Sequence, residues 1–281
     1  MSRTEFGYHS ICGQKHSLQH IKESVEKLHF GTTPIPFANK YKPSGTLLAS
    51  LHHTTGRVIS HNVDKWGRWT SQTLQGKHDR RITVVNVYQV IADTSGTGMV
   101  TSATQQRSLL LESEDRLSDP REAFLRDLTV YLQECVSKGD ELLVMGDFNE
   151  RIGVEQNPTS AMLSEFGLVN LMLSRHSAPL PVTYARGRKC LDYGFATAHV
   201  AQALVACGYE VFNARYPTDH QPYLFDFDAD KLFGNATPTL SSPNQRILHS
   251  TNLKQVTQYI KILYDSLLEC NVFNRARRLH Y

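Results

Sequence analysis

The chain has 281 residues, of which 40% are hydrophobic and 20% are charged, with a formal net charge of +3 at pH 7. These values predict a soluble globule with a sizeable core, and the mild positive charge excludes a dedicated nucleic-acid coat while suiting a partner that carries phosphates. Five scattered cysteines without a CxxC pair favour a reducing intracellular compartment, and the sequence contains neither a recognisable secretory signal nor an apolar run of membrane-spanning length.

Short strands dominate the first part of the chain. Residues 1–42 read as a poorly defined segment with one short helix over 16–28. After the turn YKPSGT, the runs GTLLASLHH, GRVISHNV and GRWTSQTL are typical of antiparallel strands joined by hairpins. The stretch RRITVVNVYQV, residues 80–90, gives the strongest strand signal because it is rich in β-branched residues. The Gly/Thr/Ser-rich residues 92–104 predict a flexible crossover.

A helix and a buried strand follow at the centre of the chain. Residues 119–139 predict a helix with Asp119 at the N-cap, Pro120 at the first helical position and Gly139 as the stop. The apolar run ELLVMGDFNE, residues 141–150, predicts a strand that is buried on both faces. Two strands connected through a helical crossover indicate a layered α/β architecture.

The rest of the chain alternates between helices and strands. We expect helices over 157–172, 198–208 and 252–270, and strands over 189–197, 209–214 and 221–228. The Pro/Ser-rich residues 236–246 are typical of a linker. The predicted domain organisation has four parts: a remnant segment over 1–42, a main domain over 43–235, a linker over 236–250, and an amphipathic helix with a basic tail over 251–281.

Polar side chains stand where three predicted strands begin or end. GDFN at 146–149 closes one strand, TDHQP at 218–222 precedes another, and Asp192 interrupts the apolar run CLDYGFAT. In layered α/β proteins, the ends of buried strands hold reactive side chains rigidly at an open edge. A turn or a helix cap explains each motif taken alone, but three acidic motifs in one domain favour a site. A buried Asp192 requires a donor, and a histidine imidazole suits that task.

These motifs also carry a family resemblance. In chain order, NVY (86–88), GDFN (146–149), LDY (191–193) and TDHQP (218–222) resemble the metal-dependent endonuclease/exonuclease/phosphatase family over roughly residues 43–228. The neighbouring text KPSGTLLAS, WGRW and PREAF is similar to the retrotransposon-type branch, which is related to the abasic-site endonucleases. The resemblance implies an α/β fold, a four-layer αββα sandwich of two packed mixed sheets.

The resemblance further implies hydrolysis of a phosphodiester by in-line attack of water, assisted by Mg (or Mn). A hard cation prefers carboxylate oxygens, the attacking water needs a base, and the charge that develops on phosphorus needs donors. By carry-over from the family motif, Asp147 orients or deprotonates the water. Asn149 holds the water or the phosphate through its amide.

The other motif residues receive roles in the same way. His220 donates to a phosphate oxygen, Asp192 holds the ring of His220 in the required tautomer, and Asp219 lies beside the metal. Tyr88 points its hydroxyl toward the phosphate, although a half-buried strand tyrosine explains it equally well. Arg188, in the loop TYARGRKC, is a candidate for contact with substrate phosphates, and a solvated loop is the alternative.

The start of the family pattern is missing. The family begins with one strand that ends in asparagine and a second that ends in a metal-binding glutamate, and nothing before Ser17 reads as either strand. Glu5 is the only acidic residue before Glu23, and the expected ligand position falls near Tyr8. We therefore do not assign the metal role to Glu5, and we expect an N-terminally truncated nuclease domain with weakened cation binding.

Three functions compete at this point. The first is a DNA endonuclease domain of retrotransposon origin, the second is a phosphatase or phosphodiesterase that acts on a small phosphorylated substrate, and the third is a catalytically inactive nuclease fragment. The mild basicity and the retroelement-like flanks favour DNA as the partner. No membrane association and no stable protein partner are predicted, and the expected location is intracellular, or nuclear for a functional retroelement endonuclease.

Overall fold

The computed structural model divides the chain into two compact units, Met1–Thr239 and Leu240–Tyr281. Within the part of the chain that the structure describes, no helix combines the length and the apolar character that a membrane crossing requires. The described residues are 4–6, 45–50, 52–92, 101–113, 119–153, 157–213, 218–234, 253–269 and 271.

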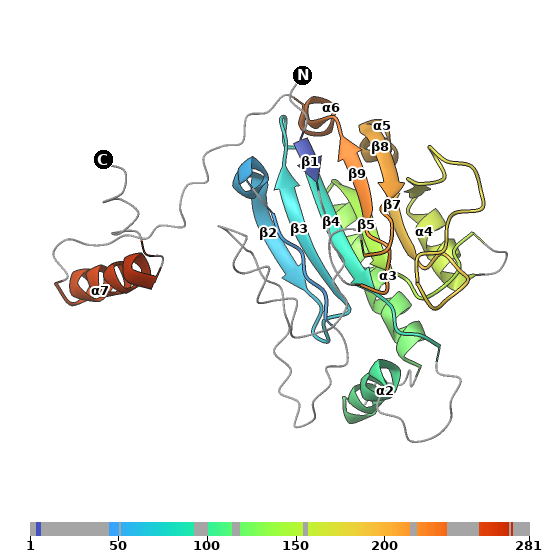
Figure 1. Ribbon diagram of the computed structural model, residues 1–281, viewed down its shortest axis with the longest axis horizontal. Coiled ribbons are helices and arrows are strands. Elements are labelled where there is room, and N and C mark those ends of the chain that lie inside the picture. Colours follow the sequence, from blue (N-terminus) through green and yellow to red (C-terminus); the bar gives the residue numbers. More distant parts are fainter. Residues whose placement is uncertain are drawn as a thin grey trace. The chain divides into compact units, whose positions relative to one another are not determined.

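A six-stranded sheet forms the centre of the first unit, with the strand order β2-β3-β4-β5-β7-β6 (Figure 1). The neighbours β4 and β5 run parallel, and the other neighbouring pairs are antiparallel, so the sheet is mixed. A parallel pair needs a long crossover, which here contains the helices α2 and α3. The strands are β2 (Val58–Val63), β3 (Trp69–Gln75), β4 (Arg81–Tyr88), β5 (Asp140–Asp147), β6 (Val169–Asn170) and β7 (Asp192–Ala196).

A smaller antiparallel sheet packs against one face of the large one. It has the order β1-β9-β8, with β1 at Thr4–Phe6, β8 at Leu204–Tyr209 and β9 at Tyr223–Phe227. The two sheets approach closely where β7 faces β9, because a Cβ added at Gly194 would lie 2.3 Å from Cζ of Phe225. One core cluster joins residues of both sheets, among them Ile82, Val84, Leu143, Met145, Leu204, Phe225 and Phe227.

Helices cover the other face of the large sheet. The helix α3 (Pro120–Ser137) packs Phe124, Leu128 and Leu132 against β4 and β5, as part of a second core cluster. It begins as the sequence predicts, with the Asp119 side chain accepting from the Arg121 N–H and with Pro120 in the first turn. The α/β fold with two packed sheets is thereby confirmed. The other helices among the described residues of this unit are η1 (His52–Arg57), α2 (Ser102–Glu112), α4 (Pro158–Glu165), α5 (Ala198–Gln202) and α6 (Ala229–Phe233).

Two predicted helices are too long. The helix predicted over 198–208 ends at Gln202, because Leu204–Tyr209 pairs with β9 as strand β8, and this tertiary pairing overrides the helical pattern. The strand predicted over 209–214 is wrong for the same reason, since Tyr209 is the last residue of β8. The helix predicted over 157–172 stops before Gly167, whose φ of 62° suits a helix end, and β6 follows.

The N-terminal part also differs from expectation. The short strand β1 precedes Ser17, where no strand is predicted, and it pairs with β9. Residues 45–50 form no strand, and η1 follows them. The predicted flexible crossover gives way to α2 from Ser102, which a capping box between Thr101 and Thr104 starts. The helix predicted over 16–28 and the linker over 236–246 lie outside the described residues.

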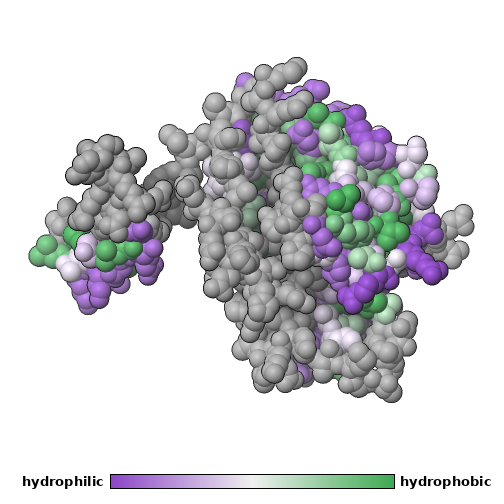
Figure 2. Space-filling view, in the orientation of Figure 1, coloured by the Kyte–Doolittle hydropathy of each residue, from purple (hydrophilic) through white to green (hydrophobic). Residues whose placement is uncertain are grey.

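The second unit contains the predicted amphipathic helix, α7 (Leu253–Glu269). Figure 2 shows that its hydrophobic and hydrophilic residues gather on different sides. Leu253, Ile260 and Leu263 are among the exposed hydrophobic residues of the chain. The apolar side of α7 therefore faces outward from this unit.

The parallel pairing of β4 and β5 depends on Gly146. Its φ is 143°, which residues with a Cβ rarely adopt, and a Cβ there would lie 2.0 Å from the carbonyl oxygen of Val87. The next register pair brings Tyr88 opposite Asp147. Any side chain at position 146 must therefore push apart the two strand ends that carry these residues.

We predict that Gly146→Ala lowers the free energy of unfolding by more than about 2 kcal/mol, because the new methyl group meets backbone atoms that have no room to move. Chemical denaturation measures this loss. Gly139→Ala is the matched control, since Gly139 also has a positive φ but nothing within 4 Å of an added Cβ, and its expected loss is about 1 kcal/mol. Equal losses in both variants would contradict the steric argument.

Candidate active site

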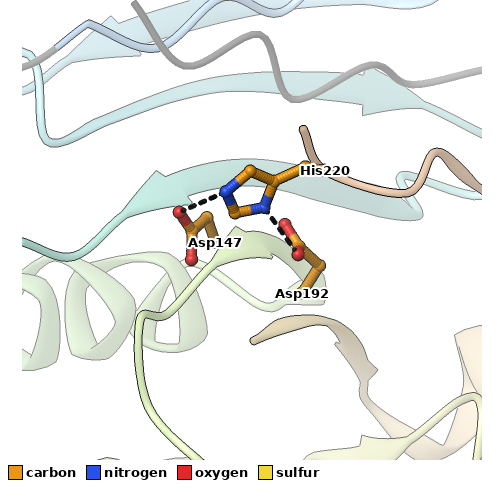
Figure 3. A group of neighbouring side chains, drawn as sticks. All are labelled: Asp147, Asp192 and His220. Atoms are coloured by element: carbon orange, nitrogen blue, oxygen red, sulfur yellow. Dashed lines mark hydrogen bonds and ion pairs between the residues drawn. The ribbon is translucent and has the colours of Figure 1, made fainter. Parts of the chain in front are cut away.

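Three ionisable side chains converge where β5 ends and β7 begins. Asp147 is the last residue of β5 and Asp192 the first of β7, and the antiparallel register places the two directly opposite each other. His220 comes from the segment before β9 and forms an isolated β-bridge with Tyr184. Figure 3 shows the imidazole of His220 lying between the two carboxylates.

The histidine contacts the two carboxylates through different ring nitrogens. Nδ1 of His220 lies 2.9 Å from Oδ2 of Asp192, within hydrogen-bonding distance. Nε2 of His220 lies 3.9 Å from Oδ2 of Asp147. Both aspartates are only 3% exposed, whereas His220 is half-buried. The arrangement is a hydrogen-bonded His–Asp pair whose free ring nitrogen faces a second buried carboxylate.

The charges in this cluster shift two pKa values upward. Burial raises the pKa of Asp147, the like charge of Asp192 raises it further, and together they outweigh His220 and the Asn149 donors, so that it reaches about 7. Burial lowers the pKa of His220, but the hydrogen bond and the charge of Asp192, with the charges of Asp147 and Asp219, raise it to about 9. The imidazole therefore carries a proton at neutral pH, while Asp147 is close to its own midpoint.

Asn149 adopts the positive φ of 45° that places its donors around Asp147. Its backbone N–H donates to Oδ1 of Asp147 at 2.9 Å, and its side-chain amide donates to Oδ2 at 3.0 Å and to the carbonyl of Gln89 at 2.8 Å. Tyr88 is half-buried at the end of β4, next to Asp147 in the sheet. The structure thus gathers both residues beside the cluster.

Two predicted site residues lie outside the cluster. Asp219 is exposed, and its carboxylate pairs with Nη2 of Arg186 at 2.9 Å. Arg188 is also exposed, in the same loop. The structure therefore places Asp219 and Arg188 at the surface beside the site rather than among the buried groups.

One neighbour of the cluster escaped the sequence reasoning. The ring of Tyr184 lies 5.1 Å from the ring of His220, centroid to centroid, and the guanidinium carbon of Arg186 lies over the ring of Tyr184, 5.6 Å from its centroid. In the sequence TYARGRKC, a tyrosine two residues before an arginine is the local signal for this contact.

The cluster suits a hydrated hard cation in part. Among the described residues, Asp147, Asp192 and His220 are the one group whose ligand atoms all lie within 4.8 Å of one another. A protonated imidazole is no ligand, and Asp192 is occupied by its hydrogen bond to His220. Asp147 remains as the buried oxygen ligand, which fits Mg²⁺, because this ion binds through one or two carboxylates and otherwise keeps its waters.

The backbone register places Glu5 away from the cluster. The register of β1 pairs Glu5 with Asp226, and β1 runs antiparallel to β9. Six residues separate Asp226 from His220, which at about 3.3 Å per extended residue amounts to roughly 20 Å. Phe6 lies one position nearer to the site in this register, and Tyr8 lies outside the described residues, so the ligand position expected near it stays a prediction.

We predict that His220 in the metal-free protein titrates near pH 9, and that Asp192→Asn lowers this pKa by removing the charge and the hydrogen bond that hold the proton. NMR titration in the presence of EDTA measures both values. Because the folded pKa exceeds the ordinary value of 6.5, this pair stabilises the fold fully below about pH 6.5 and loses that effect as the pH rises through about 9.

Asp79→Asn is the control for this titration, because Asp79 is exposed in the turn between β3 and β4 and its positive φ also suits asparagine. It should leave the pKa of His220 unchanged. An unshifted pKa in Asp192→Asn would show that the observed hydrogen bond does not control the protonation of His220.

We compared the chain with known families, curated proteins and solved structures. No protein-family model and no curated protein matches the chain. Among solved structures, the chain is similar to the AP endonuclease LMAP from Leishmania major and to the human Nocturnin catalytic domain. Each shows 16% identity and a TM-score of 0.47 over 76% of this chain, with 74% and 76% of the other chain covered, respectively.

The endonuclease domain of TRAS1, a telomere-specific non-LTR retrotransposon, is also similar, at 15% identity and a TM-score of 0.39 over 60% of this chain and 68% of that domain. A 3' phosphatase, NExo from Neisseria, bound to a product DNA hairpin, shows 17% identity and a TM-score of 0.44 over 61% of this chain and 71% of that one. These structural neighbours all belong to the endonuclease/exonuclease/phosphatase superfamily, the family that the four motifs of the sequence resemble.

Proposed function

We propose that the first unit hydrolyses phosphodiester bonds in DNA with the help of a divalent cation, as an endonuclease domain of retrotransposon origin. The observation that carries the proposal is the hydrogen-bonded Asp192–His220 pair whose free ring nitrogen faces the carboxylate of Asp147. This set combines a proton acceptor with a charged donor at one strand edge. The four motifs in family order support the same reaction.

Asp147 is the base of the proposed reaction. Its oxygen accepts a proton from water, the water oxygen bonds to phosphorus, and the bond from phosphorus to the leaving ester oxygen breaks. Burial raises the pKa of this carboxyl in the metal-free protein, which strengthens it as a proton acceptor. The donors of Asn149 hold both oxygens of this carboxylate in place.

His220 supplies positive charge to the phosphate. Its Nε2–H donates to a phosphate oxygen as negative charge builds there, and Asp192 holds the ring through Nδ1 and keeps it protonated. Tyr88, at the neighbouring strand end, donates its hydroxyl to the same phosphate. These donors are fixed before the substrate binds, so little reorganisation is needed during the reaction.

The cation in the proposal is Mg²⁺ or Mn²⁺, which when bound stabilises the charge on the phosphate oxygens. Asp147 would hold it, together with Asp219, whose exposed carboxylate pairs with the exposed side chain of Arg186. Arg186 and Arg188 would contact neighbouring phosphates of the substrate. We also keep the predicted extent of the catalytic domain, residues 43–235, as part of this proposal.

One observation favours the inactive alternative. The backbone register pairs Glu5 with Asp226, and the cluster among the described residues contains two carboxylates, of which Asp192 is hydrogen-bonded to His220. Cation binding in this chain should therefore be weak, and activity should require millimolar rather than micromolar metal. A small phosphorylated substrate would use the same groups, and it is distinguished from DNA by salt dependence, because DNA contacts release counterions.

We predict that the protein nicks supercoiled plasmid DNA with Mg²⁺ or Mn²⁺ and not with EDTA. Asp147→Asn and His220→Ala should each lower the rate by about 100- to 10,000-fold, the usual range for loss of a general acid or base. His61→Ala, an exposed histidine on the edge strand β2, should keep the wild-type rate. Gel analysis of nicked circles over time gives the rates.

The outcomes separate the three functions. Folded wild-type protein that nicks no DNA but hydrolyses bis(p-nitrophenyl) phosphate would favour a small substrate, and inactivity on both would favour the inactive fragment. Nicking that survives in both site variants would point to a contaminating nuclease and remove the support for the proposed site.

We predict that titration calorimetry detects weak Mn²⁺ binding by the wild type, and that Asp147→Asn weakens the binding by at least about 10-fold. Asp219→Asn should weaken it less, because Asp219 is exposed and shares its charge with Arg186. Asp79→Asn is the control and should bind like the wild type. A tighter-binding Asp147→Asn variant would exclude Asp147 as a ligand.

A further inference from the structure

The two members of the His–Asp pair come from distant parts of the chain. Asp192 opens β7, His220 precedes β9, and 28 positions separate them. A hydrogen bond of 2.9 Å between such segments needs something that fixes both backbones relative to each other. Thr183 contacts both.

The side chain of Thr183 holds the Asp192 segment. It is fully buried, and its hydroxyl oxygen accepts from the backbone N–H of Leu191 at 2.8 Å and from that of Asp192 at 3.2 Å. These are the two amides at the start of β7, immediately before the carboxylate that holds His220. The hydroxyl oxygen of Thr183 thus fixes the position of the backbone where β7 begins.

The backbone of Thr183 holds the His220 segment. Its carbonyl accepts from the N–H of Gln221 at 2.8 Å, the next residue forms the β-bridge with His220, and the N–H of Ala185 donates to the carbonyl of Asp219 at 2.7 Å. Residues 183–185 therefore pair with residues 219–221 on both sides of the histidine.

We propose that Thr183 is a positioning residue that sets the hydrogen bond between Asp192 and His220. Thr183 lies between the two segments. A substitution can remove its side-chain hydroxyl, and with it the hydrogen bonds to the Asp192 segment, while the backbone hydrogen bond to Gln221 stays in place. Loss of the hydroxyl leaves two amides at the start of β7 without their acceptor, so that this strand end must move to find water or another partner. The catalytic consequence rests on the proposed function, but the geometric one does not.

Two variants separate the hydroxyl from the packing of the side chain. Thr183→Val keeps the shape and removes the hydroxyl, while Thr183→Ser keeps the hydroxyl and removes a methyl group. Thr83→Val is the matched control. Thr83 is fully buried in β4 and its hydroxyl donates to Asp140, at the opposite end of β5 from Asp147. Its loss should destabilise the fold without reaching the pair.

The first readout is the NMR signal of the proton on Nδ1 of His220, which is strongly downfield when it is hydrogen-bonded to a carboxylate. We expect Thr183→Val to lose or shift this signal, and Thr183→Ser and Thr83→Val to keep it. The second readout is the rate of metal-dependent hydrolysis, where Thr183→Val should lower kcat by about 10-fold or more with KM within about 3-fold.

Each outcome is decisive. If Thr183→Val and Thr83→Val lower the melting temperature alike while both keep the downfield signal and kcat, Thr183 is structural only and the proposal is overturned. If the wild type hydrolyses nothing, the proposed function fails and the NMR signal alone tests Thr183. If Thr183→Val does not fold, the serine variant provides the test. Thr183→Ser keeps the hydroxyl, so loss of the downfield His220 signal in this variant would show that the methyl group, and not the hydroxyl, positions the pair, and would overturn the proposal.

Discussion

Two buried carboxylates lie opposite one another in neighbouring strands, and the site is organised around the positive charge that this arrangement demands. The register of β5 and β7 fixes Asp147 and Asp192 opposite each other. Because both side chains are buried, water does not screen the repulsion between their charges. A protonated His220 neutralises part of the charge, which is why its proton is held so tightly. The negative charge that remains on the two carboxylates gives this strand edge an affinity for further positive charge.

The surrounding fold makes this concentration of charge tolerable. Close packing of the two sheets at Gly194 and Phe225 and the helix α3 on the other face hold β5 and β7 rigidly. Strands anchored in two cores cannot relax away from electrostatic repulsion, so the stability of the apolar layers offsets the cost of the polar edge. Gly146 contributes to the same rigidity, because the absence of a side chain there lets the ends of β4 and β5 lie close together.

Sequence reasoning reached the elements whose information is local. The β-branched run of β4, the apolar run of β5 and the capped helix α3 each carry their own signal, and the motifs indicated Asp147, Asp192 and His220, which the structure gathers at one edge. It failed where the secondary structure of a segment depends on pairing with a distant strand. Residues 204–208 are predicted as helix and form a strand instead, because they pair with β9. A buried threonine such as Thr183 has no local signal at all, because its importance lies in which amides the fold brings to it.

The exposed ion pair of Arg186 and Asp219 and the buried ion pair of Asp192 and His220 differ in how strongly dissolved salt weakens them. The screening length at physiological ionic strength is about 8 Å, and exposed pairs contribute about 0–1 kcal/mol, so the contact between Arg186 and Asp219 exchanges readily with dissolved ions. The pair of Asp192 and His220 is shielded by the protein and is insensitive to salt by comparison. One of these ion pairs is thus buried and persistent, whereas the other lies at the solvent boundary, where dissolved anions can replace Asp219 as the partner of Arg186.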